Sequence, residues 1–187
     1  MARKAFRQYV ILLVIGLLLP ACACGSGGGV ASPAGVAEQP TPTTNAGGLW
    51  PNFADPQYGV SLQVPAEWQP VAGYEKRYGG PDGFFQLSAA GEGISLDYLC
   101  DITAHHKLKP YGSAPTIERR PVAGRDACLI LPSSDQPPLE KGSAALIVPY
   151  PTQQMIGSER YQYFVLYADE EHITQIADSL QFTTGGS

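Results

Sequence analysis

The chain has 187 residues, of which 44% are hydrophobic, so it is long enough to form a domain with a sizeable core. Its formal net charge is −5, from 12 Lys and Arg residues and 17 Asp and Glu residues. Because nucleic-acid binding depends on basic side chains, this balance argues against a nucleic-acid partner.

The first 21 residues have the organisation of a signal peptide. Arg3, Lys4 and Arg7 form a basic start, an apolar run follows over residues 9–19, and small residues come next. A membrane-spanning helix is the alternative, but it needs about 20 apolar residues, and this run is much shorter. We therefore expect residues 1–21 to be removed on export.

A short motif at the end of the predicted signal peptide indicates a site of lipid attachment. Leu19-Pro20-Ala21-Cys22 resembles the bacterial lipobox, in which an aliphatic residue stands three positions before an invariant Cys. The resemblance implies a diacylglyceryl group on the Cys22 thiol, and several acyl chains anchor a protein stably to a membrane. Cys24 fits less well, because Ala21 occupies the position of the aliphatic residue. We expect a chain anchored at Cys22 to the bacterial cell membrane or outer envelope, with its domain outside the cytoplasm.

Residues 22–49 are expected to form a flexible tether. The stretch 25–48 is rich in Gly, Pro and Thr, and Glu38 is its single charged residue. Such a segment buries too little apolar surface to fold. Cleavage before Cys22 leaves 9 Lys and Arg residues against all 17 Asp and Glu residues, a net charge of −8. Residues 50–187 then form a single domain.

The first part of this domain has the alternation of β-strands. Residues 58–64 place apolar side chains at every second position, and Pro65 ends the run. Two further strands are expected at 74–78 and 84–89, because the sequence between them, Gly-Gly-Pro-Asp-Gly, is dense in turn residues. These patterns predict a hairpin.

An amphipathic helix follows the hairpin. Apolar residues at helical spacing begin after Ser95, which is suited to an N-cap, and continue to Leu108. Pro110 and Gly112 close the helix. Cys100 lies on its apolar face, so its side chain should point at whatever the helix covers.

The second half of the domain is again rich in strand patterns. Strands are expected at 116–122, 125–131, 143–150 and 161–168. The last of these is apolar almost throughout, which is typical of a central strand covered on both faces. A helix over 170–180, capped by Asp169, completes the chain. This order predicts an α+β fold, an antiparallel β-sheet of about six to seven strands flanked by two helices.

Cys100 and Cys128 are the two cysteines of the predicted domain. In an exported protein such a pair indicates a disulfide, and two separately buried thiols are the alternative. Cys100 belongs to a helix and Cys128 to an apolar strand. A bridge therefore requires the helix to lie across the sheet, on the face to which Cys128 points. We expect this bridge.

The segment Tyr58-Gly-Val-Ser-Leu-Gln-Val-Pro65, followed by Trp68, resembles the start of PsbP/Mog1-like domains, which commonly begin YGFSI–x–P–x–x–W. The closing helix and the sequence Asp-Ser-Leu-Gln-Phe at 178–182 are similar to the end of those domains. The resemblance implies a sheet flanked by helices, in a family dominated by non-enzymatic accessory and binding proteins. It transfers no functional residue, because the matching positions are core and turn positions.

One candidate for metal chemistry lies on the first predicted helix. Asp97, Asp101 and His105 are spaced four residues apart and share one helix face, with His106 adjacent. Carboxylates and imidazoles on one face can bind a metal ion. A solvated polar face is the alternative and is favoured, because no H-E-x-x-H pattern is present.

Two other groups of residues are candidates for a functional role. Ser133, Ser134 and Asp135 with the distant His172 could form a hydrolytic site, but the G-x-S-x-G motif is missing. Tyrosine occurs both in cores and at interfaces. Tyr111 and Tyr150, which lie beside prolines, are the tyrosines that we expect to be exposed for recognition. The segment 106–115 suggests no mechanism.

The sequence therefore predicts a membrane-anchored extracytoplasmic lipoprotein with a non-catalytic binding or accessory domain. We expect no catalytic residue and no cofactor. The partner beyond the membrane is an unknown protein, an envelope polymer or a small ligand. The alternative is an envelope enzyme, such as a metal-assisted hydrolase that uses Asp97, Asp101, His105 and His106.

Overall fold

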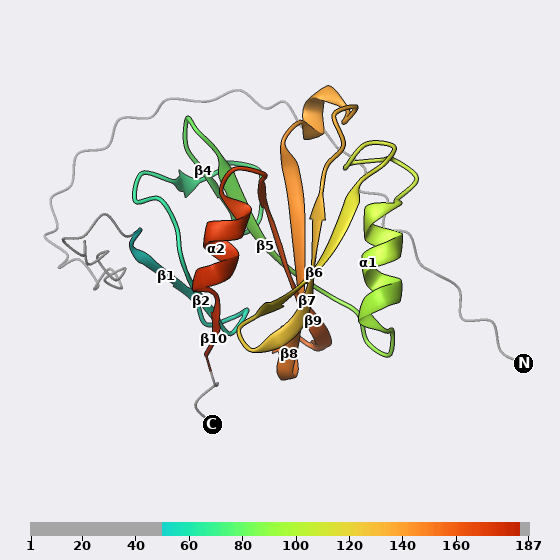
Figure 1. Cartoon of the computed structure of the whole chain (residues 1–187). Coiled ribbons are helices and arrows are strands. Elements are labelled where there is room, and N and C mark those ends of the chain that lie inside the picture. The colour runs from blue at the N-terminus through green and yellow to red at the C-terminus, as the bar shows by residue number, and fades with distance from the viewer. Residues whose placement is uncertain (1–49, 184–187) are drawn as a thin grey trace, which may run out of the picture. The chain divides into compact units, whose positions relative to one another are not determined.

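The computed structural model describes residues 50–183, which form the α+β arrangement shown in Figure 1. The predicted signal peptide, the predicted lipid anchor at Cys22 and the predicted tether at 22–49 lie outside the described residues. The strands are β1 (Asn52–Asp55), β2 (Val60–Gln63), β3 (Gln69–Pro70), β4 (Arg77–Gly79), β5 (Phe84–Ala90), β6 (Thr116–Val122), β7 (Arg125–Leu131), β8 (Ser143–Ile156), β9 (Glu159–Asp169) and β10 (Gln181–Phe182). The helices are α1 (Leu96–Ala104), the 3-10 helix η1 (Pro138–Glu140) and α2 (Ile173–Ser179).

The strands form two antiparallel sheets. The larger has seven strands in the order β3-β4-β5-β9-β8-β7-β6, and the smaller has the order β1-β2-β10. β9 occupies the middle of the larger sheet, as its nearly continuous apolar sequence predicts. The β6–β7 hairpin turns at Ala123 and Gly124, whose φ angles of 49° and 70° favour the right-handed twist of a tight two-residue turn.

Alternate side chains of the central strands enter two separate cores. On β9, Phe164 and Leu166 pack on one face, and Tyr163 and Val165 pack on the other. Figure 1 shows α2 (red) and α1 (yellow-green) on opposite sides of the sheet. Burial on both faces explains why β9 lacks the apolar–polar alternation of a half-exposed strand.

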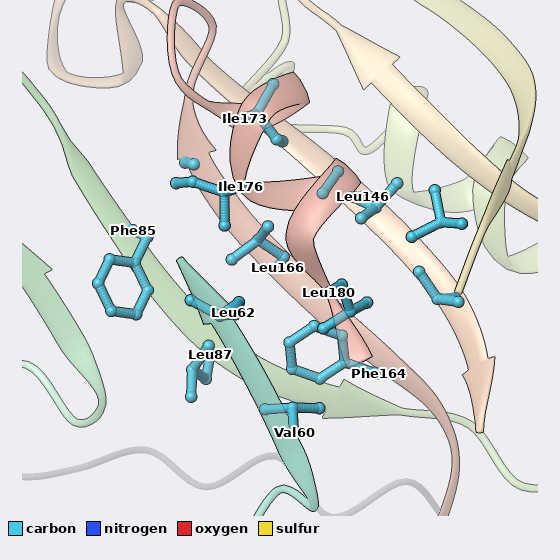
Figure 2. Packing of buried hydrophobic residues seen from close by; sticks show 14 of the residues in the cluster. Val60, Leu62, Phe85, Leu87, Leu146, Phe164, Leu166, Ile173, Ile176 and Leu180 are labelled. Atoms are coloured by element: carbon cyan, nitrogen blue, oxygen red, sulfur yellow. The ribbon is translucent and has the colours of Figure 1, made fainter. Parts of the chain in front are cut away.

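The core on the α2 side also takes up the smaller sheet. Val60 and Leu62 of β2 are fully buried there, as the period-two pattern predicts. Figure 2 shows these two side chains beside residues of β5 and β9, with Ile173 and Ile176 of α2 closing the cluster. This face of the larger sheet is thus covered by a second sheet and a helix together.

The core on the α1 side contains a disulfide. Cys100 of α1 is bridged to Cys128 of β7, with their Cα atoms 6.5 Å apart. Cys128 shares its sheet face with Ile130, and α1 packs against β6, β7 and β8 on that face. The predicted bridge is confirmed, because the alternation of β7 turns Cys128 toward the helix.

The edge strand β6 contacts both helices. Successive residues of a strand point to opposite faces. Arg119 accordingly forms an ion pair with Asp97 of α1, and Arg120 forms one with Asp178 of α2. Both pairs are substantially exposed, so each contributes little stability, but together they orient the two helices over the same edge of the sheet.

Both predicted helices are shorter than expected. Ser95 caps α1 as predicted, since its hydroxyl accepts from the Tyr98 amide, but the helix ends at Ala104, and Leu108 is 71% exposed. α2 begins at Ile173 rather than at residue 170, because Asp169 is the last residue of β9. The Asp169 carboxylate accepts from the amides of Phe84 and His172, and so caps the preceding turn instead.

The predicted strand at 74–78 is wrong in its bounds. Lys76 has a φ of 56°, which interrupts an extended backbone, and strand β4 begins only at Arg77. The Lys76 ammonium lies 2.7 Å from the buried carboxylate of Asp55 in β1. Residue 76 is therefore positioned by a partner 21 residues away in the chain, which the local pattern could not reveal.

We expect the disulfide to contribute about 3–4 kcal/mol to the free energy of unfolding, from the closure entropy of a loop of 28 residues. Replacement of both cysteines, Cys100→Ala with Cys128→Ala, should lower the denaturant midpoint of the protein accordingly. Equilibrium unfolding followed by circular dichroism measures the difference. A reducing agent should destabilise the wild-type protein and leave the double variant unchanged. An identical midpoint for wild-type protein with and without reductant would contradict the structural role.

Candidate functional site

One row of residues on the α1 side crosses six of the seven strands of the larger sheet, and its side chains change from apolar to polar halfway. The strand pairings place six residues side by side, from the β6 edge to β4: Ile117, Ile130, Ala145, Tyr167, Gln86 and Arg77. The first three lie beneath α1, and the last three extend beyond it. This face of the sheet is therefore apolar where the helix covers it and more polar where it does not.

A cavity of about 470 Å³ lies over the uncovered half of this face. Its floor comes from β4, β5 and β9, and its walls come from the end of α1, the segment that follows α1, and η1. Its lining residues are Arg77, Phe84, Gln86, Ile102, Thr103, His106, Pro110, Tyr111, Glu140, Ser143 and Tyr167. A volume of this size falls in the range of pockets that bind small molecules.

Large apolar side chains are exposed around the cavity. Ile102, which lines it, is 40% exposed; Leu108, two positions from the lining residues His106 and Pro110, is 71% exposed, and Leu139, which precedes Glu140, is 97% exposed. Exposed apolar side chains beside a cavity are available for contact with a ligand. The rim thus has the composition of a contact surface.

Arg77 is the charged residue of the cavity floor. Its guanidinium carbon lies 3.9 Å from the centre of the Phe84 ring and 4.7 Å from that of the Tyr74 ring. Such stacking fixes the plane of the guanidinium and leaves the N–H groups at its edge free to donate. Within residues 50–183, Arg77 forms no ion pair with a carboxylate.

The other ionisable residues of the lining are varied in kind. Burial raises the pKa of the Tyr111 and Tyr167 phenols, so both remain protonated and able to donate hydrogen bonds at neutral pH. His106 and Glu140 lie on the exposed side. The site therefore offers apolar contact, several hydrogen-bond donors and one guanidinium.

The segment 106–115, to which the sequence attached no mechanism, forms one wall of this cavity. The Ser133 amide donates to the Tyr111 carbonyl at 2.9 Å, and the Ser133 hydroxyl accepts from the Ala114 amide. Asp135 accepts from the Ser113 amide at 3.0 Å. These contacts hold the segment against the residues that follow β7, so the wall has a defined position.

Gln136 completes the bracing of the wall. Its side-chain amide donates to the carbonyls of Pro110 and Ser143 at 2.8 and 2.9 Å, and its oxygen accepts from the Gly142 amide at 2.8 Å. A single side chain thereby joins the segment after α1, the loop after η1 and the start of β8. Of these, the segment after α1 and the start of β8 line the cavity, through Pro110 and Ser143.

The prediction that Tyr111 and Tyr150 are exposed is wrong. Tyr111 is 4% and Tyr150 is 7% exposed. Tyr111 belongs to the core beneath α1, and Tyr150 packs against Phe164 and Phe182 in the other core. Neighbouring prolines indicated loops, but both phenyl groups lie over apolar strands that bury them. Tyr111 retains a role as part of the cavity lining.

The four candidate metal ligands do not converge on a common point, and each has a contact within the protein. Asp97 pairs with Arg119, and Asp101 Oδ1 lies 3.0 Å from His105 Nδ1. His106 Nδ1 accepts from the Leu108 amide. Within residues 50–183, no group of three or more His, Cys, Asp or Glu side chains is arranged to hold a metal ion. The side chains of Asp97, Asp101 and His105 on this face of α1 are exposed.

The structure does not bring the candidate hydrolytic residues together. The Ser133 hydroxyl lies 2.5 Å from Asp135, and hydrogen bonds from Ser113 and Ser133 hold the pKa of Asp135 well below its usual range. A carboxyl group of such low pKa is a poor general base. His172, the proposed third member, has its Nδ1 2.5 Å from Asp169 on the opposite side of the domain's sheet.

His172 instead belongs to a packed cluster at the start of α2. Its ring lies 5.0 Å from Trp68 and 5.5 Å from Trp50, measured between ring centroids. The Trp68 indole donates to Asp82, which lowers the pKa of that carboxyl group. Gly83 must be glycine here, because a Cβ atom would lie 2.2 Å from the Asp169 carboxylate. The cluster fixes the β4–β5 turn to α2.

Sequence reasoning missed Arg77, Gln86 and Tyr167 as site residues. Gln86 and Ser88 alternate with the buried Phe85 and Leu87 on β5, and this polar face was a usable sign of an uncovered strand. Nothing in the sequence placed Arg77 beside Gln86, since that register depends on the turn between β4 and β5.

Comparisons with protein families, with curated proteins and with solved structures gave no match. Neither helix of residues 50–183 has the length and hydropathy of a membrane span.

We expect Gln136→Ala to lower the free energy of unfolding by about 1–3 kcal/mol, because it leaves partly buried backbone groups without their hydrogen bonds. Hydrogen exchange of the Gly142 amide, measured by NMR, should become faster. Gln153→Ala, at an exposed position of the β8–β9 hairpin, is the matched control and should change stability by less than about 0.5 kcal/mol. Equal effects of the two substitutions would show that Gln136 does not brace the wall.

Proposed function

We propose that this chain is a lipid-anchored protein of the bacterial cell envelope whose domain binds a ligand without catalysing a reaction. The cavity beside α1 is the observation that carries the proposal. It is concave, lies on rigid strands, and has an exposed apolar rim and a floor of convergent polar groups. These are the general properties of a ligand site.

The lipid anchor is part of the proposal and is supported by the sequence of residues 1–22. The disulfide supports the location outside the cytoplasm, because such bonds persist in oxidising compartments. The resemblance of the start and end of the domain to PsbP/Mog1-like domains supports a binding or accessory role. An α+β sheet with a helix on each face agrees with that resemblance at the level of architecture.

The enzymatic alternative has less support. A metal-assisted hydrolase would need Asp97, Asp101, His105 and His106 to converge, but Asp97 pairs with Arg119, and within residues 50–183 no group of three or more such side chains is arranged to hold a metal ion. Within the cavity, His106 and Glu140 are both exposed, and no hydrogen bond between them is present in residues 50–183. General acid–base catalysis needs a base held within hydrogen-bond reach of its target.

Substitution of the anchoring residue tests the location. Because Cys22 supplies the thiol of the motif that resembles a lipobox, Cys22→Ser should leave the protein without a lipid and move it from the detergent phase to the aqueous phase on phase separation. Cys24→Ser is the matched control and should stay in the detergent phase. Unchanged partitioning of Cys22→Ser would contradict the lipoprotein assignment.

An uncharged fluorescent probe tests the cavity. Phenylnaphthylamine should bind the unlipidated Cys22→Ser chain at one site, with enhanced fluorescence. Adding Gln86→Trp, which fills the floor of the cavity, should weaken binding about tenfold or more, since bulk forced into occupied space costs about 1–3 kcal/mol.

Gln153→Trp is the control for the added indole, because Gln153 lies on the exposed hairpin away from the cavity lining. It should leave the dissociation constant unchanged. Absence of binding, or equal binding by both tryptophan variants, would overturn the assignment of the cavity as the ligand site.

A further inference from the structure

The basic residues of the domain are distributed unevenly. All 9 Lys and Arg residues of the mature chain lie within the described residues. Three of them are held in ion pairs there: Lys76 with Asp55, Arg119 with Asp97, and Arg120 with Asp178. The other basic residues are Arg77, Lys107, Lys109, Arg125, Lys141 and Arg160.

Four of these remaining basic residues line the cavity or are next to a lining residue in the sequence. Arg77 lines it, Lys107 and Lys109 flank the lining residues His106 and Pro110, and Lys141 follows Glu140. Acidic residues lie close by as well: Glu140 lines the cavity, Asp101 precedes the lining residue Ile102, Asp135 accepts from the Ser113 amide of the wall, and the Glu170 amide donates to the Gly142 carbonyl. Arg77 is nevertheless the one Lys or Arg residue of the lining, and within residues 50–183 no carboxylate pairs with it.

The position of the Arg77 guanidinium indicates which chemical groups it can bind. The guanidinium lies over the Phe84 and Tyr74 rings, and no carboxylate within residues 50–183 pairs with it, so its N–H groups are available to a ligand. A planar guanidinium donates two parallel hydrogen bonds to a carboxylate, a phosphate or a sulfonate. Gln86 and Tyr167, its neighbours in the cross-strand row, add further donors on the same floor.

The rest of the lining is suited to an apolar group. Phe84, Tyr111, Ile102 and Pro110 surround the cavity, and its volume of about 470 Å³ accommodates a molecule of ring-system size. An anionic group at Arg77 would therefore leave the remainder of such a molecule against aromatic and aliphatic side chains.

We infer that the cavity binds small amphipathic anions: molecules with one carboxylate, phosphate or sulfonate group, held by Arg77, and a compact aromatic or branched apolar body. The inference rests on the proposed function and names the ligand class of the same site. Lys107 and Lys109 on the wall raise the local concentration of the anion, and Arg77 makes the direct contact.

Two fluorescent probes that differ by a single anionic group test this ligand class. Anilinonaphthalene sulfonate has the ring system of phenylnaphthylamine with a sulfonate added. Titrated into the unlipidated Cys22→Ser chain, the sulfonate should bind about tenfold or more tightly than the neutral probe, as expected for hydrogen bonds to a charged group. This preference should shrink as salt is added.

Arg77→Gln should remove the preference by weakening the sulfonate about tenfold or more while leaving the neutral probe unchanged. Arg160→Gln is the matched control, because it removes the same charge from the exposed tip of the β8–β9 hairpin. If Arg77→Gln unfolds the domain, the double variant Lys107→Gln with Lys109→Gln is measured instead and should weaken the sulfonate alone.

The outcomes separate the two proposals. Equal affinity for both probes, with binding still lost in Gln86→Trp, would overturn the anionic ligand class and retain the cavity as a binding site. Sulfonate binding that is unchanged in Arg77→Gln would also overturn the ligand class. Binding of neither probe, or binding insensitive to Gln86→Trp, would overturn the proposed function with it.

Discussion

The alternation of side chains along β7, β8 and β9 is the constraint on which the rest of the structure depends. Because these strands are apolar at successive positions, both faces of the sheet must be covered, and each core requires its own covering layer. On one face β2 and α2 provide that layer, and on the other α1 does so alone. The disulfide from Cys100 to Cys128 and the ion pairs of Arg119 and Arg120 then position these layers at the β6 half of the sheet.

The cavity follows from this unequal coverage. α1 has nine residues and packs on β6, β7 and β8, so it leaves the α1 side of β4 and β5 without a covering element. The same cross-strand row that is apolar at Ile130 becomes polar at Gln86 and Arg77. The uncovered part of the sheet therefore carries polar side chains, which can remain in contact with water. The segment after α1 forms one wall of the cavity above it. Gln136 gives that boundary its rigidity, which a binding site requires in order to avoid an ordering cost.

Charge has a different role on the two sides of the domain. Around α2, charged side chains stabilise the structure. Asp169 caps the turn before α2, and Asp82 accepts a hydrogen bond from the Trp68 indole. Asp55, which is buried, is neutralised by Lys76. Around the cavity, by contrast, Arg77 and the lysines of the adjoining segments have no carboxylate partner within the described residues. Arg77 differs from the other unpaired basic residues because it lines the cavity and lies over the Phe84 and Tyr74 rings, and the proposed anion contact rests on that position.

The sequence by itself determined the fold class, most strands, the first helix with its Ser95 cap, and the pairing of the two cysteines. These features depend on local periodicity and on which face a residue occupies, and both can be derived from spacing. The tertiary structure decided what depends on distant partners: the early end of α1, the start of β4 after Lys76, and the burial of Tyr111 and Tyr150. It also decided the site, because Arg77, Gln86, Tyr167 and His106 come from four separate segments. Their assembly depends on strand register and on how far one helix extends over a sheet, and neither quantity is encoded in any single stretch of the chain.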